Sequence, residues 1–397
     1  MAVLFGVDHA ATDRAALVQG KRIALLTNDA ATTAAFPYPC VASRVALAGA
    51  GARLVRLFSP EHGLGAAAAD GRKVGDQVDP LTGAPVVSLY GSGVAPRPEH
   101  LADIDLVVCD LQDVGVRFYT YAWTMTHVID ACAAASVPVV VLDRPNPLGG
   151  DLAAAEGPIL DETITESLVG RHSIPVRHSL TLGELARLWV RERCTSARLS
   201  VVTMTGWRRR MHWPQLGLPF VPASPAMPAY DTAIVYPGAC FLEGTNLSEG
   251  RGTSFPFRVA GAPWLDAVQV ADRLNAAALP GFRARPVEFQ PTASKFADMS
   301  CRGAMLHVTD AARFRPVAAG LHLICAIRGA HPSQFAWGPY PRADDPRSGS
   351  HFDRLVGSKS VRRSIQDDPT AAAALVEQWT EAPGWARRVA PILLYPR

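Results

Sequence analysis

The fold is decided by the stretch LVRLFSPEHG at residues 54–63, in which an apolar run leads directly into a polar cluster. Four other apolar runs end in the same way. In an open α/β sheet, ligands bind outside the carboxyl ends of parallel strands, so polar residues from several such ends form one site. The sequence therefore indicates an enzyme. The four further runs and their polar ends are Ile23–Leu26 with Asn28 and Asp29, Val86–Leu89 with Tyr90 and Gly91, Leu106–Cys109 with Gln112 and Asp113, and Val137–Leu142 with Asp143–Pro147.

The apolar runs are almost continuous rather than alternating, which is typical of parallel strands buried on both faces. Ala-rich helical stretches separate them, and this alternation predicts a Rossmann-like, doubly wound sheet. Thr181 and Glu184 have the spacing of a capping box at the start of one helix. The helices expected here are Arg44–Ala52, Thr126–Ala135 and Thr181–Arg193, and Leu199–Met204 is expected to be a further strand.

A chain of 397 residues is too long for one ordinary core, so we expect two domains. The proline-rich segment Trp213–Pro228 disfavours regular structure. We place the boundary near residue 230, with a Rossmann-like catalytic domain at 1–230 and a smaller α/β (α+β) domain at 231–397. In the second domain we expect strands at Ile234–Tyr236, Phe282–Glu288 and Ala304–Val308, and helices at Pro263–Ala278, Pro316–Ile327 and Pro369–Trp379.

Composition excludes several classes of function. The net charge is only +3, and no basic stripe of the kind that nucleic acid requires is present. The run Arg208–Arg210 is expected to be a solvated turn. No apolar stretch approaches the roughly 20 residues of a membrane span. Seven cysteines without a C-x-x-C spacing indicate a reducing compartment. Residues 1–8 lack the features of a signal peptide, so we expect a cytoplasmic protein.

Known cofactor and nucleophile templates are absent from the sequence. No complete G-x-G-x-x-G follows the first strand, and neither G-x-S-x-G nor H-E-x-x-H occurs. The glycine-rich segment Glu243–Thr253 lacks the ending of a P-loop. We therefore expect no cofactor and no metal. One alternative stays open, a metal site formed by Asp8, His9, His62 and Asp110 at strand ends.

Glu61 and His62 stand between Pro60 and Gly63, a rigid frame suited to fixing a general acid. In the alternative interpretation, Glu61 pairs with an arginine and His62 bonds a backbone carbonyl. A second cluster spans 110–121, where tyrosines offer stacking faces and an arginine can bind a carboxylate. Its alternative is a structural loop pinned by Asp113 and Arg117. The Asp143–Gly150 turn, with Asn146, is interpreted equally well as a structural turn or a binding loop.

Taken together, these clusters resemble the peptidoglycan exo-β-N-acetylmuramidase family of the NamZ type, long catalogued as a domain of unknown function. The resemblance runs through nearly the whole chain in the right order. It is carried by Thr27-Asn28, Ser59–Gly63, Ser88–Gly91, Asp110–Tyr121, Asp143–Gly150, Glu156-Gly157, Arg177-His178, Tyr236–Gly238, Glu243–Thr253, His307–Asp310 and Phe352-Asp353, among other segments.

The resemblance implies a Rossmann-like catalytic domain, a smaller α/β domain and an active-site cleft between them. It implies release of N-acetylmuramic acid from the non-reducing ends of peptidoglycan fragments, with Glu61 as the catalytic acid. Two positions depart from the family pattern. The segment after the Ser59–Gly63 motif reads Leu64-Gly65, whereas family members usually carry an Arg-Gly pair one residue further along the chain. Ala226 stands where an asparagine is usual. These departures keep open a non-catalytic or altered-specificity binder of amino sugars or muropeptides.

The expected substrate is an oligosaccharide that contains N-acetylmuramic acid; nucleic acid and membrane are not expected partners, and the oligomeric state stays open. Arg117 or Arg251 is the candidate for the lactyl carboxylate. The second catalytic group is Asp113, Asp110, Glu243 or the substrate's own acetamido group. The third hypothesis is a metal-dependent hydrolase that uses His9, His62 and Asp110. The catalytic candidates are Glu61, His62, Asp113 and Tyr119, and the substrate-binding candidates are Asn28, Tyr90, Gln112, Arg117, Tyr121, Asn146, Glu243, Asn246 and Arg251.

Overall fold

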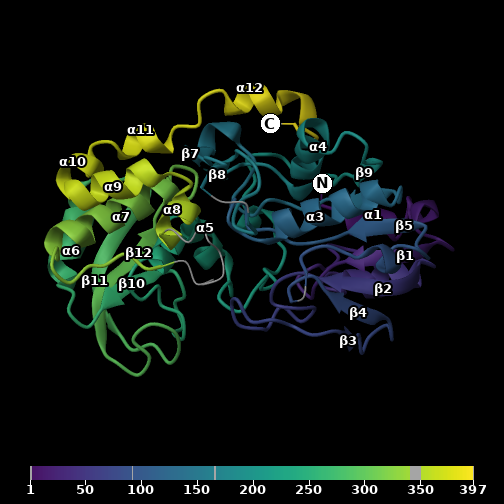
Figure 1. Cartoon of the computed structure of the whole chain (residues 1–397), viewed down its shortest axis with the longest axis horizontal. Coiled ribbons are helices and arrows are strands. Elements are labelled where there is room, and N and C mark those ends of the chain that lie inside the picture. Colours follow the sequence, from purple (N-terminus) through teal and green to yellow (C-terminus); the bar gives the residue numbers. More distant parts are fainter. Residues whose placement is uncertain (1, 92, 165–166, 340–349, 397) are drawn as a thin grey trace.

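The computed structural model describes residues 2–91, 93–164, 167–339 and 350–396. Within these residues, a seven-stranded, mostly parallel sheet and a three-stranded antiparallel sheet lie toward opposite ends of the long axis of the molecule (Figure 1). The arrangement confirms the predicted Rossmann-like domain with a smaller second domain. In the described part of the chain, no helix has the length and apolar character needed to cross a bilayer.

The large sheet is covered on both faces, as the continuous apolar strands predict. Successive side chains of a strand point to opposite faces. Ile23 and Leu25 of the central strand pack with the first two helices, whereas Ala24 and Leu26 pack into a second core with the next two. In order across the sheet the strands are β3 (Gln77–Val78), β4 (Pro85–Ser88), β2 (Arg53–Ser59), β1 (Arg22–Leu26), β5 (Leu106–Cys109), β6 (Val139–Leu142) and β9 (Leu199–Val202).

The predicted capping box starts the last helix on this sheet. Thr181 Oγ1 accepts from the Glu184 amide at 3.2 Å, and Glu184 Oε2 accepts from the Thr181 amide at 3.1 Å. Glu184 also binds Arg209, which is 3% exposed, so the expectation of a solvated turn at Arg208–Arg210 is wrong for its middle residue. The helices of this half are α1 (Gly6–Ala10), α2 (Ser43–Gly49), α3 (Tyr121–Ala134) and α4 (Leu182–Glu192).

The second half contains one wrong prediction of element type. Residues 234–236 lie inside helix α5 (Tyr230–Ala239), not in a strand, because a short apolar run does not by itself distinguish the two. Gly238 lets α5 cross α7 closely, since a Cβ there would clash with the Pro316 carbonyl oxygen. The predicted helix at 369–379 is two short helices. The remaining elements are β7 (Glu156–Ile159), β8 (Pro175–Arg177), η5 (Cys240–Gly244), β10 (Val259–Ala262), α6 (Ala267–Ala276), β11 (Phe282–Phe289), β12 (Cys301–Val308), α7 (Pro316–Ala330), α8 (His351–Val356), α9 (Lys359–Asp367), α10 (Pro369–Ala373), α11 (Val376–Thr380) and α12 (Trp385–Val389).

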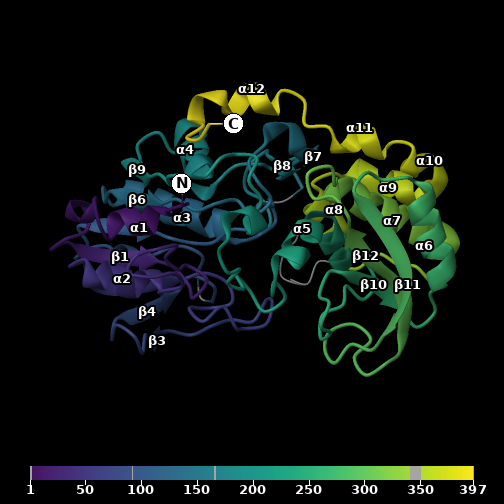
Figure 2. The ribbon, with the colours of Figure 1, turned by 180° about the vertical axis from the view of Figure 1, so that it is seen from behind.

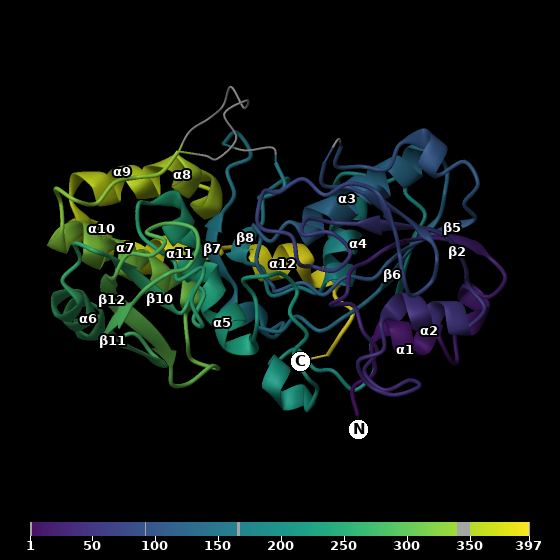
Figure 3. The same cartoon turned by 90° about the horizontal axis from the view of Figure 1, so that it is seen from below.

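The C-terminal segment returns from the second half to the first. Figures 1 and 2 show α10, α11 and α12 running in succession along the top of the molecule toward α4, and Figure 3 shows α12 between the two halves. The Trp385 indole donates to the His178 carbonyl at 2.9 Å, and the Tyr395 hydroxyl donates to Asp143 at 2.5 Å. We therefore propose a boundary near residue 230, with residues 381–396 as a strap on the first domain.

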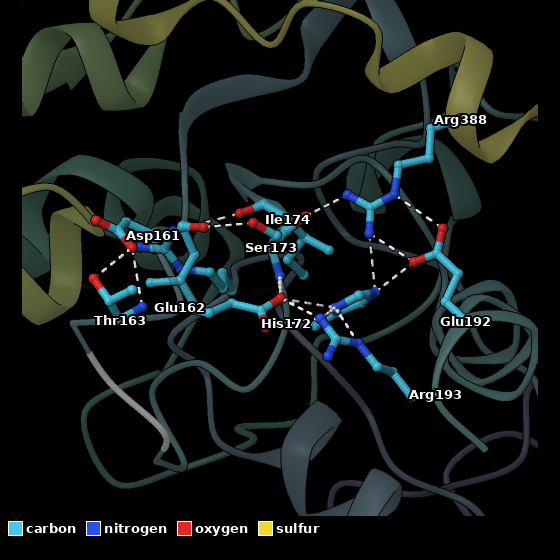
Figure 4. Close-up of polar contacts among 11 residues, drawn as sticks. Asp161, Glu162, Thr163, His172, Ser173, Ile174, Glu192, Arg193 and Arg388 are labelled. Atoms are coloured by element: carbon cyan, nitrogen blue, oxygen red, sulfur yellow. Dashed lines mark hydrogen bonds and ion pairs between the residues drawn. The ribbon is translucent and has the colours of Figure 1, made fainter.

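An ion cluster fastens this strap. Arg388 donates to Glu192 at 2.6 Å, and Glu192 also contacts His172 Nε2 at 2.5 Å (Figure 4). On the other side of the His172 ring, Arg193 pairs with Glu162 at 2.5 Å. The cluster thus joins α12, α4 and the loop between β7 and β8. The hydrogen bond from Arg388 is the main reason why the pKa of Glu192 falls from 4.5 to about 2.

We expect Arg388→Met to lower the midpoint of thermal unfolding by about 1–2 °C at pH 7, the effect of about 1 kcal/mol in a chain of this size. A carboxylate with a depressed pKa stabilises the fold above its unfolded pKa and loses that contribution as the pH falls toward the folded pKa. The difference from wild type should therefore shrink below pH 4.5. Unfolding scans across pH measure it. The exposed neighbour Arg387→Met is the control, and an equal loss in both variants contradicts the role of Arg388.

Candidate active site

The carboxyl ends of β1, β2 and β5 lie side by side in the middle of the large sheet. Leu26 pairs with Phe58 on one side and with Cys109 on the other. The chain extends the sheet from β1 toward β2 and β4, and then crosses back to add β5 on the opposite side. This is the topological switch point, where doubly wound sheets bind ligands. Asn28, Glu61 and Asp110 follow these three strands.

Glu61 is held in a tight turn directly after β2. His62 has a φ of 69° and Gly63 a φ of 75°, so the chain reverses in the left-handed region immediately after the glutamate. The Glu61 side chain is largely buried, and its Oε1 accepts from the Gly71 amide at 3.2 Å. His62 Nδ1 donates to the Ala68 carbonyl at 2.7 Å, which turns Nε2 toward Asp70 at 3.6 Å. The turn thus fixes one carboxyl group and one imidazole beside the 66–76 loop.

Two tyrosines, Tyr119 and Tyr121, lie at the start of α3 within range of the Glu61 charge. Their rings lie 4.7 Å apart in an edge-to-face arrangement. Asn28 Nδ2 donates to the Tyr121 hydroxyl at 2.9 Å, and that hydroxyl donates to the Ala223 carbonyl at 2.5 Å. Burial raises the pKa of Tyr119, and the neighbouring charges of Asp113 and Glu61 raise it further. Tyr119 therefore keeps its hydroxyl proton, within range of the charges of both carboxylates.

Aromatic contacts continue from these tyrosines into the second half. The Tyr236 ring of α5 lies 6.0 Å from Tyr119 and 4.7 Å from Phe257. The guanidinium carbon of Arg251 lies 4.9 Å from the centre of the Phe257 ring, within the range of a cation–π contact. The site is thus lined from both halves of the chain.

Arg251 bridges the two halves through ion pairs. Its Nη1 contacts Asp70 of the first half, its Nη2 contacts Glu243 at 2.6 Å, and its Nε contacts Glu249 at 3.2 Å. Glu243 also faces His351 at 3.6 Å. Burial opposes ionisation of Glu243, but the charge of Arg251 and the hydrogen bond from His351 hold its pKa well below the ordinary range.

The three candidate carboxylates for the second catalytic group differ in their surroundings. Asp110 is bound through both oxygens by the buried guanidinium of Arg144, with Nη2 to Oδ2 at 2.8 Å. Glu243 is bound by Arg251 and His351. Asp113 accepts from the Gly115 amide at 2.7 Å through Oδ2 alone, and its buried Oδ1 has no hydrogen-bond partner among the described residues.

Asp113 faces a histidine that the sequence did not single out for catalysis. The Leu180 amide donates to His178 Nδ1 at 3.1 Å, so Nδ1 is an acceptor and the neutral ring carries its proton on Nε2. That Nε2 points at Asp113 Oδ2 from 3.6 Å. Both side chains are almost fully buried.

Several predicted binding residues instead hold the backbone. Arg117 is fully buried, and its guanidinium donates to the carbonyls of Pro158, Ile174 and Leu355. It is therefore not available to bind a substrate carboxylate, and the predicted pairing with Asp113 is not what pins this loop. The remaining contacts of this kind are Asn146 with Leu148 and Leu180, Gln112 with Asp113 and Pro145, and Asn246 with Gln334 and Ala336.

Tyr90 lies beside a pocket that adjoins the Glu61 loop. Its carbonyl accepts from the Val74 amide at 3.2 Å. The pocket has a volume of about 400 Å³ and is lined by Lys73, Val74, Gly75, Asp76, Ser88 and Gly91.

The proposed metal ligands are not brought together. Asp8 lies in α1 rather than at a strand end, and its carboxylate accepts from the backbone amides of residues 34–36. His9 bonds Asp13 and Thr205. Among the described residues, no group of three or more His, Cys, Asp or Glu side chains is arranged to hold a metal ion. The alternative of a metal site formed by Asp8, His9, His62 and Asp110 is therefore not supported by the geometry of the described residues.

The two departures from the family pattern lie in packed cores. Leu64 is 3% exposed, and its carbonyl accepts from the Asp29 amide at 2.8 Å. Ala226 is 8% exposed and packs in the larger core. Sequence reasoning also overlooked site residues, chiefly Asp70, His178 and Tyr236. Asp70 sits in an Ala-rich loop without any motif, and only the Arg177-His178 match pointed toward the histidine.

Two family models match the chain. Residues 23–231 match the model described as exo-beta-N-acetylmuramidase NamZ, N-terminal, and residues 234–395 match its C-terminal counterpart. The chain belongs to the NamZ family. It is 40% identical over 362 residues to the peptidoglycan beta-N-acetylmuramidase NamZ of Bacillus subtilis (strain 168), covering 91% of this chain and 84% of the relative.

Two crystal structures of DUF1343 family proteins from Bacteroides fragilis NCTC 9343 share the fold of this NamZ family member. One has a TM-score of 0.86 at 31% identity and covers 99% of both chains. The other has a TM-score of 0.72 at 26% identity and covers 100% of this chain and 99% of its own. The whole described architecture, including the second half, is therefore shared.

Proposed function

We propose that this protein is an exo-β-N-acetylmuramidase that releases terminal β-linked N-acetylmuramic acid from the non-reducing ends of peptidoglycan fragments. The observation that carries the proposal is the position of Glu61, fixed at the switch point of the sheet, with Arg251 reaching toward its loop from the second half. Membership of the NamZ family and the name of the Bacillus subtilis relative support the same activity.

Glu61 is the general acid that protonates the leaving glycosidic oxygen. A positioned carboxylic acid commonly contributes about 10²–10⁴-fold to the rate of such a step. The backbone amide of Gly71 and the 62–63 turn hold the group in place.

Asp113 is the second group, because Asp110 and Glu243 are both committed to arginines. Its Oδ1, which no described residue hydrogen-bonds, accepts a hydrogen bond from a water or from the substrate's acetamido N–H. The Gly115 amide orients the carboxylate through Oδ2, and His178 Nε2 lies 3.6 Å from the same oxygen. In the first case Asp113 activates the water, and in the second it orients the acetamido group that attacks the anomeric carbon.

Arg251 binds the lactyl carboxylate that distinguishes N-acetylmuramic acid from N-acetylglucosamine. A guanidinium donates strong charge-assisted hydrogen bonds to carboxylates, and the Phe257 ring packs against its face. Its present partner on Nη1, Asp70, is a carboxylate from another loop.

The test is turnover of two chromogenic glycosides that differ only in the lactyl group. We expect release of the chromophore from the β-N-acetylmuramic acid glycoside and at least about 100-fold lower kcat/KM for the β-N-acetylglucosamine glycoside, since a lost charge-assisted hydrogen bond commonly reduces transition-state binding by about 2–3 kcal/mol. Binding of the first sugar without any turnover contradicts the enzyme and leaves the amino-sugar binder.

A further inference from the structure

The guanidinium of Arg251 is surrounded by carboxylates. Each of its three nitrogens faces a different one, from Asp70, Glu243 and Glu249. Glu243 and Glu249 belong to the same segment of chain as Arg251. Asp70 comes from the loop after β2, in the other half of the molecule. The Asp70 contact is therefore the one in this set that joins the two halves.

The network contains three carboxylates but only one arginine and one lysine. Lys295 lies 3.0 Å from Glu249 Oε2, and its ammonium also donates to the carbonyls of Leu242 and Leu247 at 2.8 Å. Arg251 and Lys295 thus balance Glu243 and Glu249 without Asp70. A third carboxylate gives the network one negative charge in excess, apart from the histidines His62 and His351.

Asp70 is the most exposed of the three carboxylates. Its side chain is 43% exposed, whereas those of Glu243 and Glu249 are 23% and 2% exposed. Its other contact is His62 Nε2 at 3.6 Å. Burial of the carboxyl group raises the pKa of Asp70, Arg251 lowers it, and the charges of Glu243 and Glu61 add to the rise. The two glutamates share a segment of chain with Arg251, whereas Asp70 reaches it from a separate and more exposed loop.

We propose that Asp70 is a tethered stand-in for the substrate carboxylate, occupying Arg251 Nη1 in the empty site and leaving it when the lactyl carboxylate of the sugar binds. The inference rests on the proposed function. The exchange replaces one carboxylate by another, so the charge of the network is the same before and after. Asp70 then turns toward solvent with its loop.

This exchange makes Asp70 an internal competitor that acts on carboxylated sugars alone. A sugar with a carboxylate recovers the ion pair that it displaces, whereas a neutral sugar gains nothing from Arg251. Asp70 also lowers the affinity for the correct sugar, because the competitor is part of the chain and always present. Removing its charge should therefore strengthen the binding of carboxylated sugars alone.

The experiment measures binding by calorimetry in the Glu61→Gln background, where bound sugar is not hydrolysed. The ligands are the β-methyl glycosides of N-acetylmuramic acid and N-acetylglucosamine. We expect Asp70→Asn to tighten binding of the first by about 2- to 5-fold, the range set by a partly exposed ion pair, and to leave the second unchanged. When Glu61 is retained, Asp70→Asn should lower the KM for the chromogenic glycoside of N-acetylmuramic acid by a similar factor.

The matched control is Asp105→Asn. Asp105 pairs with Arg22 at 2.8 Å with a side chain 40% exposed, but it precedes β5 and so lies at the opposite edge of the sheet. It should change the affinity for neither sugar. Unfolding midpoints of both variants confirm that the chains are folded.

Four results overturn the inference. Unchanged or weaker binding of the muramic acid glycoside shows that Asp70 does not compete for Arg251. Equal tightening of both sugars shows that the loop blocks the site without regard to charge. A large loss of turnover with unchanged binding makes Asp70 a catalytic carboxylate. If neither sugar binds to any folded variant, the proposed function has failed and the inference fails with it.

Discussion

Replacing Glu61 by glutamine is expected to lower kcat for a β-N-acetylmuramic acid glycoside by about 10²–10⁴-fold, because glutamine keeps the shape of the side chain but has no acidic proton to transfer. The amide oxygen can still accept from the Gly71 amide, so the turn after β2 should survive. Affinity for the sugar should change little, since the acid acts in the transition state. Steady-state kinetics together with calorimetry separate the two effects.

The leaving group supplies a sharper control for this prediction. A nitrophenolate leaves without full protonation, whereas a sugar alcohol needs the acid. The loss caused by Glu61→Gln should therefore be larger for a disaccharide than for the chromogenic glycoside. An equal loss of turnover for both substrates, or a loss of sugar binding, contradicts the role of Glu61 as general acid. The matched substitution Glu99→Gln, at an exposed glutamate in the turn before β5, should leave turnover unchanged.

The first domain was predictable because its signal is local. Continuous apolar runs become β1, β2, β5 and β6 within one or two residues of their expected bounds, since burial on both faces needs no particular partner. The capping box of Thr181 and Glu184 is likewise set within four residues. The prediction of a strand at 234–236 is wrong because the local signal is ambiguous there. The burial of this run comes from packing α5 against α7 rather than from its own period.

The site was only partly predictable, because its ion pairs join distant segments. Glu61 was visible from its Pro–Gly frame. The contacts of Arg117 were not, since they are carbonyls as far away as Leu355. Asp70 contacts Arg251 across 181 positions of sequence in a loop with no motif. Polar residue type alone therefore did not distinguish a binding arginine from one that holds the backbone.

Replacing Arg144 by methionine is expected to destabilise the protein by about 3–5 kcal/mol, because it leaves the Asp110 carboxylate buried without a counter-charge. The two side chains are 2% and 0% exposed. Arg144 Nη1 also donates to the Thr32 carbonyl at 2.7 Å, so the substitution loosens the loop after β1 as well. Chemical denaturation measures the loss. The control is Arg22→Met in the exposed pair with Asp105, where we expect less than about 1 kcal/mol.

Asp110→Asn decides whether this carboxylate is structural or catalytic. If Arg144 only neutralises and holds it, the asparagine variant should lose stability but keep kcat within several-fold of wild type in the folded fraction. Asp113→Asn should do the opposite, with a large loss of kcat and a small loss of stability, because Asp113 Oδ1 has no partner to lose in the described structure. The reverse pattern would move the second catalytic role from Asp113 to Asp110. Asp110 would then act on the substrate while paired with Arg144. Asp113, next to His178, would only hold the turn at Gly115.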